Sequence, residues 1–337
     1  MKEKPVNLIR KKIFDSQSIV ITSHLRPDGD SICTSLALYF MGKLLGKRMA
    51  IINRDPTPYP FNQFPDSKKI QIGQIPPQGY DLVILLECAN VSRSGQKNLK
   101  NYFKINIDHH YSNDYYADIN WVDPQASAVA EMAFELAEKL KINFTPQIAN
   151  HLYCGIISDT GSFQFSNTRA KSFEVCYKLI RHGANPVEAS ERLFNNNPPE
   201  KIKLLGQVLS TLQMNKEGNI AIISMFRQHL NSLKLREIDT EDVTTLARSI
   251  RGVSMVLFFK EIKKDTFRVS LRAKGTANAA QIAEHFGGGG HLHAAGFTVH
   301  GKYERLIKEV PEKVSSLLKQ QTQKQSSFSL QKNIKNR

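Results

Sequence analysis

The stretch Ser23–Ser31, with the sequence SHLRPDGDS, decides the fold of the first half of the chain. It follows Ser18–Ile21, a β-branched run typical of a strand, and it leads into Asp30–Gly46, which has the broad apolar stripe of a helix. Pro27 and Gly29 mark a tight turn between the two. A strand, a turn and a helix in this order predict the start of an α/β domain.

The alternation of strands and helices continues to about residue 182. Three further apolar runs are expected strands: Met49–Ile52, Asp81–Leu86 and Phe103–Ile107. Three segments have helical periodicity: Ala126–Leu140, Pro146–Ile157 and Thr168–His182. Residues 55–79, rich in Pro, Gln and Gly, are expected to form a loop. The predicted fold class is α/β, with a parallel sheet covered by helices on both faces.

A break near Asn195–Pro199, with three Asn and two Pro, divides the chain. We expect a first domain at 1–195, a linker helix within 196–214, and a smaller α+β domain at 215–318. The segment 319–337 is rich in Gln, Ser and Lys without an acidic residue, and we expect a disordered basic tail. An RNA-contacting arm is the alternative for this tail.

The net charge of +15 on the 337 residues is unevenly distributed. Residues 1–190 carry 22 Lys and Arg against 18 Asp and Glu, a net charge of +4, whereas residues 191–337 carry 24 against 13, a net charge of +11. The second half is therefore expected to meet a polyanion, such as nucleic acid or a nucleotide phosphate. The alternative is a Lys-rich surface that only keeps the protein in solution, since +6 of the excess lies in residues 313–337.

The sequence also indicates where the protein resides. No apolar run approaches the roughly 18 residues that a membrane helix needs, so no membrane partner is expected. Residues 1–16 lack the apolar region of a secretory signal. The four cysteines form no Cys-x-x-Cys pair and are expected to be free thiols of a reducing compartment. These features predict a cytoplasmic protein.

Imidazole and carboxylate side chains gather in four short clusters that follow a strand or a helix. They are His24, Asp28 and Asp30 in the first turn, Glu87 after a strand, Asp108, His109 and His110 after the next strand, and Asp159 before Thr160 and Gly161. Side chains at the carboxyl ends of parallel strands converge. Such a set suits Mn²⁺ or Mg²⁺. A shared carboxylate bridges two ions that lie roughly 3.5–4 Å apart, a spacing typical of phosphoryl displacement.

Each cluster taken alone has a simpler explanation. An Asp-x-Asp sequence is usually a turn or a helix cap, and a His-His pair is more often a surface or core feature than a pair of ligands. Glu87 could be a buried, paired acid, and Asp159 could cap a helix. The occurrence of all four clusters in one domain, at the same kind of position, favours a metal site.

A glycine run marks the second half. Phe286 and Gly287–Gly290 precede His291, and Ala294-Ala295-Gly296 follows. Glycines let backbone amides approach an anion closely, and Arg272 and His291 add cationic donors. A flexible linker or a helix C-cap is the alternative, although the flanking small residues favour tight packing.

These motifs resemble those of the DHH phosphoesterase superfamily. The order H-x-x-P-D-G-D at His24–Asp30, an acid after an apolar strand, D-H-H at Asp108–His110 and D-T-G at Asp159–Gly161 carries the resemblance. The glycine run resembles the DHH-associated domain that accompanies it. The similarity extends over roughly residues 5–318 and is to the short members, the bifunctional oligoribonucleases and pAp phosphatases, or nano-RNases.

The resemblance implies a site with two Mn²⁺ ions, with Mg²⁺ or Co²⁺ as alternatives. It implies that His24, Asp28 and Glu87 hold one ion, and that Asp30, Glu87, His109 and Asp159 hold the other. It also implies that Asp108 orients His109, and that the catalytic His110 faces the phosphate and stabilises charge or protonates the leaving oxygen. Glu87 departs from the family pattern, which usually has Asp at this position.

The resemblance further implies how the substrate is held. The residues that would bind its phosphate are Ser270, Arg272, Lys274, Gly288, Gly289, Gly290 and His291. The implied activity is hydrolysis of short oligoribonucleotides to mononucleotides and of pAp to AMP and phosphate.

Two rival functions stay open. A phosphodiesterase of cyclic or linear dinucleotides, such as c-di-AMP or pApA, would share all these motifs. A module that binds nucleotides or RNA without catalysis is the more distant alternative. A pyrophosphatase or polyphosphatase is disfavoured by the substrate domain. The sequence leaves the oligomeric state open, with a homodimer as one option.

Overall fold

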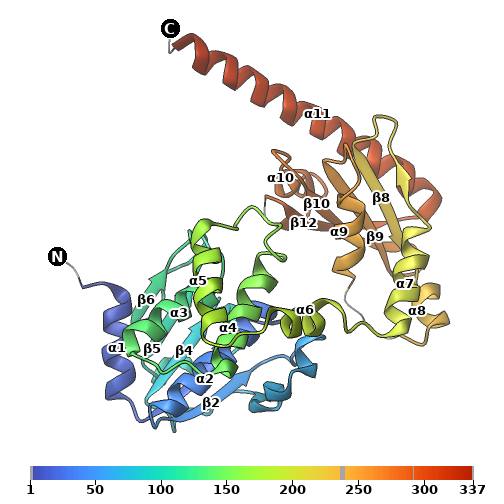
Figure 1. The fold of residues 1–337 in the computed structure, drawn as a ribbon. Helices are drawn as coiled ribbons and strands as arrows, with labels where there is room; N and C mark the ends of the chain where they lie inside the picture. The colour runs from blue at the N-terminus through green and yellow to red at the C-terminus, as the bar shows by residue number, and fades with distance from the viewer. Residues whose placement is uncertain (1–2, 236–239, 291, 336–337) are drawn as a thin grey trace. The chain divides into compact units, whose positions relative to one another are not determined.

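The computed structural model describes residues 3–235, 240–290 and 292–335. The chain divides into two compact units, Met1–Asn196 and Asn197–Arg337 (Figure 1). The division falls at the break that the sequence places near Asn195. Each unit has its own sheet and its own hydrophobic core.

Unit 1 is built on a six-stranded sheet in the order β3-β2-β1-β4-β5-β6, with every neighbouring pair parallel. The strands are β1 (Ser18–Ser23), β2 (Arg48–Asn53), β3 (Ile70–Ile72), β4 (Leu82–Leu86), β5 (Lys104–Asp108) and β6 (Ile119–Val122). The predicted parallel sheet and α/β class are confirmed. The short strands β3 and β6 are additions to the prediction, because runs of three and four residues at the sheet edges carry little apolar signal.

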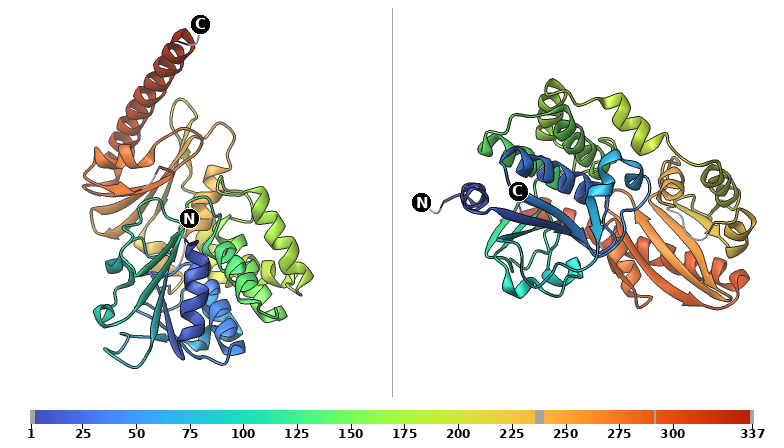
Figure 2. Two further views of the ribbon diagram at one scale, coloured as in Figure 1. Left: turned by 90° about the vertical axis from the view of Figure 1, so that its left-hand side faces the viewer. Right: turned by 90° about the horizontal axis from the view of Figure 1, so that it is seen from below.

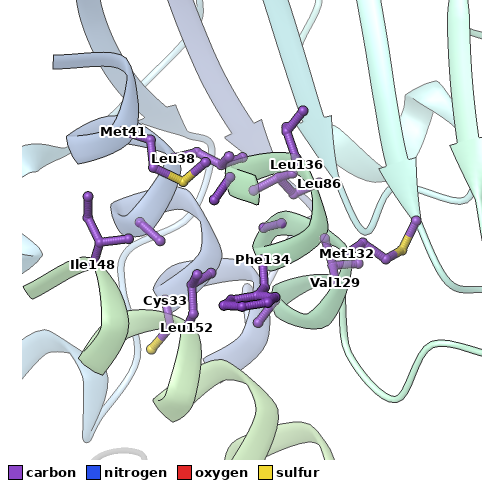
Figure 3. Close-up of a cluster of buried hydrophobic side chains, with 14 of the residues drawn as sticks. Cys33, Leu38, Met41, Leu86, Val129, Met132, Phe134, Leu136, Ile148 and Leu152 are labelled. Atoms are coloured by element: carbon purple, nitrogen blue, oxygen red, sulfur yellow. The ribbon is translucent and has the colours of Figure 1, made fainter. Parts of the chain in front are cut away.

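The α-helices of unit 1 share one hydrophobic core on one side of this sheet. They are α1 (Pro5–Asp15), α2 (Gly29–Leu44), α3 (Val129–Leu140), α4 (Pro146–Asp159), α5 (Ala170–Arg181) and α6 (Pro186–Phe194). Helices α1, α2 and α3 contact the strands of the sheet, and α4, α5 and α6 pack on these helices and on one another. Ile19, Ile21 and Ile84 of the strands join their core, and Figure 3 shows part of it around Leu38, Phe134 and Leu152. Figure 2 gives two further views of the layers.

The opposite face of the sheet differs from the expectation of helices on both sides. Val20, Val83 and Leu85, which alternate with the residues of the first face, pack there against Leu99 and Tyr102. The covering segment contains only the short 3₁₀ helices η3 (Val91–Ser94) and η4 (Leu99–Asn101). The connection from β4 to β5 contains three Asn, two Ser and one Gly, and these residues favour turns over an α-helix.

Unit 2 contains a mixed sheet in the order β11-β12-β10-β9-β8-β7, in which only β8 and β9 pair in parallel among the described residues. The strands are β7 (Gln213–Met214), β8 (Ile220–Met225), β9 (Met255–Lys263), β10 (Thr266–Ala273), β11 (Gly289–Gly290) and β12 (Ala294–His300). The helices are α7 (Pro199–Leu209), α8 (Arg227–Ser232), α9 (Glu241–Arg248), α10 (Ala279–Glu284) and α11 (Tyr303–Lys335).

Two segments of unit 2 had specific expectations from the sequence. Helix α7 lies within the expected linker-helix segment 196–214, and its Leu204 and Val208 pack in one core with Ile223 and Phe258 of the sheet. Helix α11 continues to Lys335 and so includes the described part, 319–335, of the tail that we expected to be disordered. After Pro311 the chain has no further Pro or Gly, and its Gln, Lys and Leu residues are good helix formers. No helix in the described ranges is both long and apolar enough to cross a membrane.

Candidate metal centre

The strand order of unit 1 fixes where its clusters meet. The order reverses between β1 and β4, with β2 and β3 on one side and β5 and β6 on the other. Loops that leave the carboxyl ends of parallel strands at such a point diverge and create a crevice. His24 follows β1, Glu87 follows β4, and Asp108 is the last residue of β5. Three neighbouring strands therefore deliver three of the four predicted clusters to one edge of the sheet.

The first group of converging ligand atoms belongs to His24, Asp28 and Glu87, whose atoms all lie within 4.8 Å of one another. The His24 Nε2 atom is 3.6 Å from Asp28 Oδ2 and 3.8 Å from Glu87 Oε2. The Nδ1 atom lies 2.9 Å from the Leu25 carbonyl oxygen, so it carries the proton and leaves the Nε2 lone pair facing two carboxylates. That Nε2 atom is buried without a hydrogen-bond partner among the described residues.

The second group consists of Asp30, Glu87 and His109, also within 4.8 Å. The His109 Nδ1 atom is held 3.2 Å from the Ala126 carbonyl oxygen, and its Nε2 atom lies 3.8 Å from Asp159 Oδ2. Glu87 belongs to both groups, and its Oε1 atom is buried with no partner in the described part of the chain. Two imidazole lone pairs and three further carboxylates thus lie around the carboxylate of Glu87.

The pKa values reflect the crowding of these carboxylates. Burial raises the pKa of Glu87 well above its usual range, and the charges of Asp28, Asp30 and Asp159 add to this effect. Burial likewise raises the pKa of Asp159 to about 7, against the opposing effect of His109. Acids that repel one another in this way are stabilised by divalent cations. Without thiolates, the donor set suits Mn²⁺, Mg²⁺ or Co²⁺ rather than a thiophilic ion.

Backbone geometry helps to aim the shared ligand. Glu87 has a left-handed backbone with φ of 55° immediately after β4. This conformation is uncommon for a residue with a side chain, and such strain collects at functional sites. It turns the chain sharply at the point where a carboxylate serves both groups.

Asp30 is held by helix α3, which lies about a hundred residues further along the chain. The amides of Val129 and Ala130 at the start of α3 donate to its two carboxylate oxygens, and Thr34 Oγ1 donates to Oδ1 at 2.9 Å. The positive end of a helix favours a carboxylate at this position. Gly155 of α4 leaves the room that this arrangement requires.

We expect Gly155→Ala to lower kcat by about 10²-fold, the cost of displacing an active-site group by about 1 Å. A Cβ at Gly155 would lie 2.8 Å from Asp30 Oδ1 and 2.7 Å from Ala130 Cβ, so one of the two must move. Gly206→Ala in α7 is the matched control, because nothing lies within 4 Å of a Cβ there. An unchanged kcat in steady-state assays of Gly155→Ala would contradict this placement of Asp30.

Asp108 serves a different partner from the one expected. Its Oδ1 atom accepts a hydrogen bond from the His110 ring at 2.7 Å and from the backbone amides of His109 and His110. The ring of His109 is oriented by the Ala126 carbonyl instead. Burial raises the pKa of Asp108, but its hydrogen bonds and the charge of His110 outweigh burial and lower it. The carboxylate therefore fixes the His110 ring through Nδ1.

Two of the candidate phosphate-binding residues lie on the same face of the unit 2 sheet. Ser270 and Arg272 alternate with buried residues on β10, and they lie opposite Gly296 and Ala294 of β12. Gly289 pairs with Gly296 from the far side, so small residues border this part of the face. Lys274 is exposed just beyond β10, and His291 lies outside the described residues.

The glycine run forms one of the structures considered from sequence, a helix C-cap, together with a short strand. Gly287 ends α10 with a left-handed backbone, φ of 72°, in a helix C-cap. Gly289 and Gly290 then form β11 and pair with β12, so they are not a flexible linker. A Cβ at Gly288 would lie 2.3 Å from the Gly296 carbonyl oxygen, so only glycine fits this close approach.

Comparison with known proteins decides the family. The chain matches the DHH family, N-terminal domain, over residues 18–156 and the DHHA1 domain over residues 205–320. It is 33% identical over 302 residues to the bifunctional oligoribonuclease and PAP phosphatase NrnA of Thermus thermophilus, covering 88% of this chain and 90% of that protein. The chain belongs to the DHH family. The protein of the same name from Bacillus subtilis is 29% identical over 304 residues, covering 87% and 93%.

Solved structures show the same DHH architecture. An exopolyphosphatase-related protein from Bacteroides fragilis superposes with a TM-score of 0.86 at 25% identity, covering 94% of this chain and 97% of that one. RecJ of Thermus thermophilus, solved with Mn²⁺, shares the fold at a TM-score of 0.54 and 13% identity, over 95% of this chain and 55% of that one.

Two residues of this DHH unit were missed by the sequence analysis. Asn113 donates from Nδ2 to the Asp108 carboxylate and to Asn106 Oδ1, so it supports the Asp108–His110 pair. Asn167 donates to Asp159. Both lie in loops several residues beyond the motif they support, and a lone Asn in a loop gives no signal of its own.

Proposed function

We propose that this DHH-family chain is a metal-dependent phosphoesterase that hydrolyses short oligoribonucleotides to mononucleotides and pAp to AMP and phosphate. One observation carries the proposal: a single buried carboxylate, Glu87, is common to two groups of ligand atoms. That arrangement matches a centre with two divalent ions. The names of the relatives from Thermus thermophilus and Bacillus subtilis supply the substrate class.

The proposed ions are two Mn²⁺, with Mg²⁺ or Co²⁺ as alternatives. His24, Asp28 and Glu87 would hold one ion, and Asp30, Glu87, His109 and Asp159 the other. When bound, the ions supply a hydroxide nucleophile at neutral pH and offset the charge that develops on the phosphate.

His110 and the unit 2 residues would complete the site. Because Asp108 holds the Nδ1 atom of His110, the Nε2 atom of the ring is left to bind the phosphate or to deliver a proton to the leaving oxygen. In unit 2, Ser270, Arg272, Lys274, His291 and the amides of Gly288–Gly290 would bind a substrate phosphate. A guanidinium and backbone amides are suited to this task.

The first experiment is cleavage of an end-labelled RNA pentamer with Mn²⁺, beside a 24-mer and pAp, with EDTA as the control. We expect metal-dependent conversion of the pentamer to mononucleotides and of pAp to AMP, with the 24-mer largely spared. If only c-di-AMP or pApA were cleaved in a parallel panel, the enzyme would be a dinucleotide phosphodiesterase. No cleavage of any substrate, with Mn²⁺ still bound, would leave a binding module.

We also place the protein in the cytoplasm and keep the homodimer as a prediction. All four cysteines, Cys33, Cys88, Cys154 and Cys176, are buried free thiols, which suit a reducing compartment. Sedimentation equilibrium of the full chain would measure the oligomeric state directly.

A further inference from the structure

The loop that follows Asp159 folds back on it through a strained turn. Gly161, Ser162 and Phe163 have successive positive φ values of 54°, 57° and 65°. Two of these residues carry side chains, for which left-handed backbone is unfavourable. The Ser162 amide donates to the Ile157 carbonyl at 2.7 Å, which closes the turn. Strain of this kind persists where surrounding contacts enforce it, and here the chain is directed back toward the end of α4.

Asn167 makes the returning contact. Its Nδ2 atom lies 2.9 Å from the Ser127 carbonyl oxygen, 3.1 Å from the Asp159 carbonyl oxygen and 3.3 Å from Asp159 Oδ2. All three partners are acceptors, so the amide nitrogen and not its oxygen must face them. The Asn167 Oδ1 atom is buried without a partner among the described residues. An unpaired buried acceptor is destabilising, so stability alone does not explain this side chain.

The contact with Ser127 links Asn167 to a second candidate ligand, Asp30. Ser127 lies two residues before Val129, whose amide binds Asp30. The Ser127 hydroxyl is itself fixed by the buried carboxylate of Glu131, at 2.8 Å. One amide group therefore joins the end of α4, which carries Asp159, to the start of α3, which carries the donors to Asp30. Asp30 and Asp159 are both proposed ligands of the second ion, and neither is a proposed ligand of the first.

We propose that Asn167 is a positioning residue that sets the affinity of the ion held by Asp30, Glu87, His109 and Asp159. The inference rests on the proposed two-ion centre. Partners that orient metal ligands change metal affinity by about 10–100-fold when they are removed. Asn167 touches no ligand of the His24–Asp28 group in the described structure, so the affinity of the first ion should stay the same.

The test is isothermal titration of the metal-free full chain with Mn²⁺, comparing the wild type with Asn167→Leu. Leucine has the same branched arrangement of heavy atoms as asparagine and removes its donors. The matched control is Asn120→Leu, because Asn120 Nδ2 also binds two backbone carbonyls, Tyr115 at 3.2 Å and Ala117 at 2.7 Å, away from the candidate ligands. We expect Asn167→Leu to weaken one class of site about 10–100-fold, whereas Asn120→Leu lowers only the melting temperature.

A second variant and a kinetic measurement exclude a general loss of structure. Asn167→Ser keeps one hydroxyl donor and should lie between Asn167→Leu and the wild type in Mn²⁺ affinity. At saturating Mn²⁺, KM for the RNA pentamer should be unchanged in both variants. If Asn167→Leu bound each of the two ions as tightly as the wild type does, the proposed role of Asn167 would be overturned. A wild type that binds no Mn²⁺ would instead overturn the proposed function.

Discussion

Glu87→Gln is expected to lose both metal ions and at least about 10³-fold in kcat/KM, equivalent to about 4 kcal/mol of transition-state stabilisation. Glu87 is the only residue common to both ligand groups found in the described ranges, so no ion keeps its full set without it. Glutamine preserves the volume of the buried side chain but is a much weaker ligand than a carboxylate. Metal content after gel filtration, measured by elemental analysis, checks the loss of ions.

The matched variant is His24→Ala, which removes a ligand from one group only. We expect it to retain one class of Mn²⁺ site, where Glu87→Gln retains none. Burial raises the pKa of Glu87, and the charges of Asp28 and Asp30 raise it further. A neutral amide carries neither of these penalties, so Glu87→Gln should not lower the melting temperature of the metal-free protein. Two tightly bound ions in Glu87→Gln would rule out a shared bridging role.

Arg272→Ala is expected to raise KM for the RNA pentamer by about 10–100-fold while Mn²⁺ binding stays unchanged. Loss of a charge-assisted, bidentate phosphate contact has an effect of this size. Arg268→Ala is the control, because Arg268 lies four residues earlier on the same face of β10 and its replacement removes the same charge. Initial-rate kinetics at saturating Mn²⁺ measure both variants.

The comparison separates a specific contact from the general positive charge of unit 2. If both arginine variants raised KM equally, the effect would be long-range attraction, and it would fall with added salt. If neither changed KM, Arg272 would not bind the phosphate. Only a difference between the two supports a direct contact at Arg272.

The sequence predicted which residues meet in unit 1 because their positions follow from strand ends. His24, Glu87 and Asp108 each come at the end of an apolar run, and parallel strands bring such ends to one edge. The contacts that orient them were not predictable in this way. Asp30 depends on amides of α3 that are 99 residues away, and nothing local to Asp30 signals them.

Local sequence patterns were also a poor guide to segments whose structure depends on contacts with distant residues. The glycine run was considered as a phosphate nest, a linker or a helix cap; Gly287 caps a helix, and Gly289 and Gly290 also extend a sheet, a pairing that depends on β12 and was not predicted. Asp108 was assigned to His109 by resemblance, yet the turn of the backbone brings the His110 ring to it. Helix α11 continues beyond its apolar residues, since the part after Pro311 has no Pro or Gly to end it.

All the candidate ligands lie within Met1–Asn196, whereas Arg272 and the glycine strand lie within Asn197–Arg337. Each group sits in a unit with its own core, so substitutions in one leave the packing of the other intact. Under the proposed function, mutations in β10, β12 and β11 would alter which phosphate ester is accepted, while the proposed hydrolytic centre is inherited unchanged. Such a division would let one ancestral chemistry diversify across many substrates.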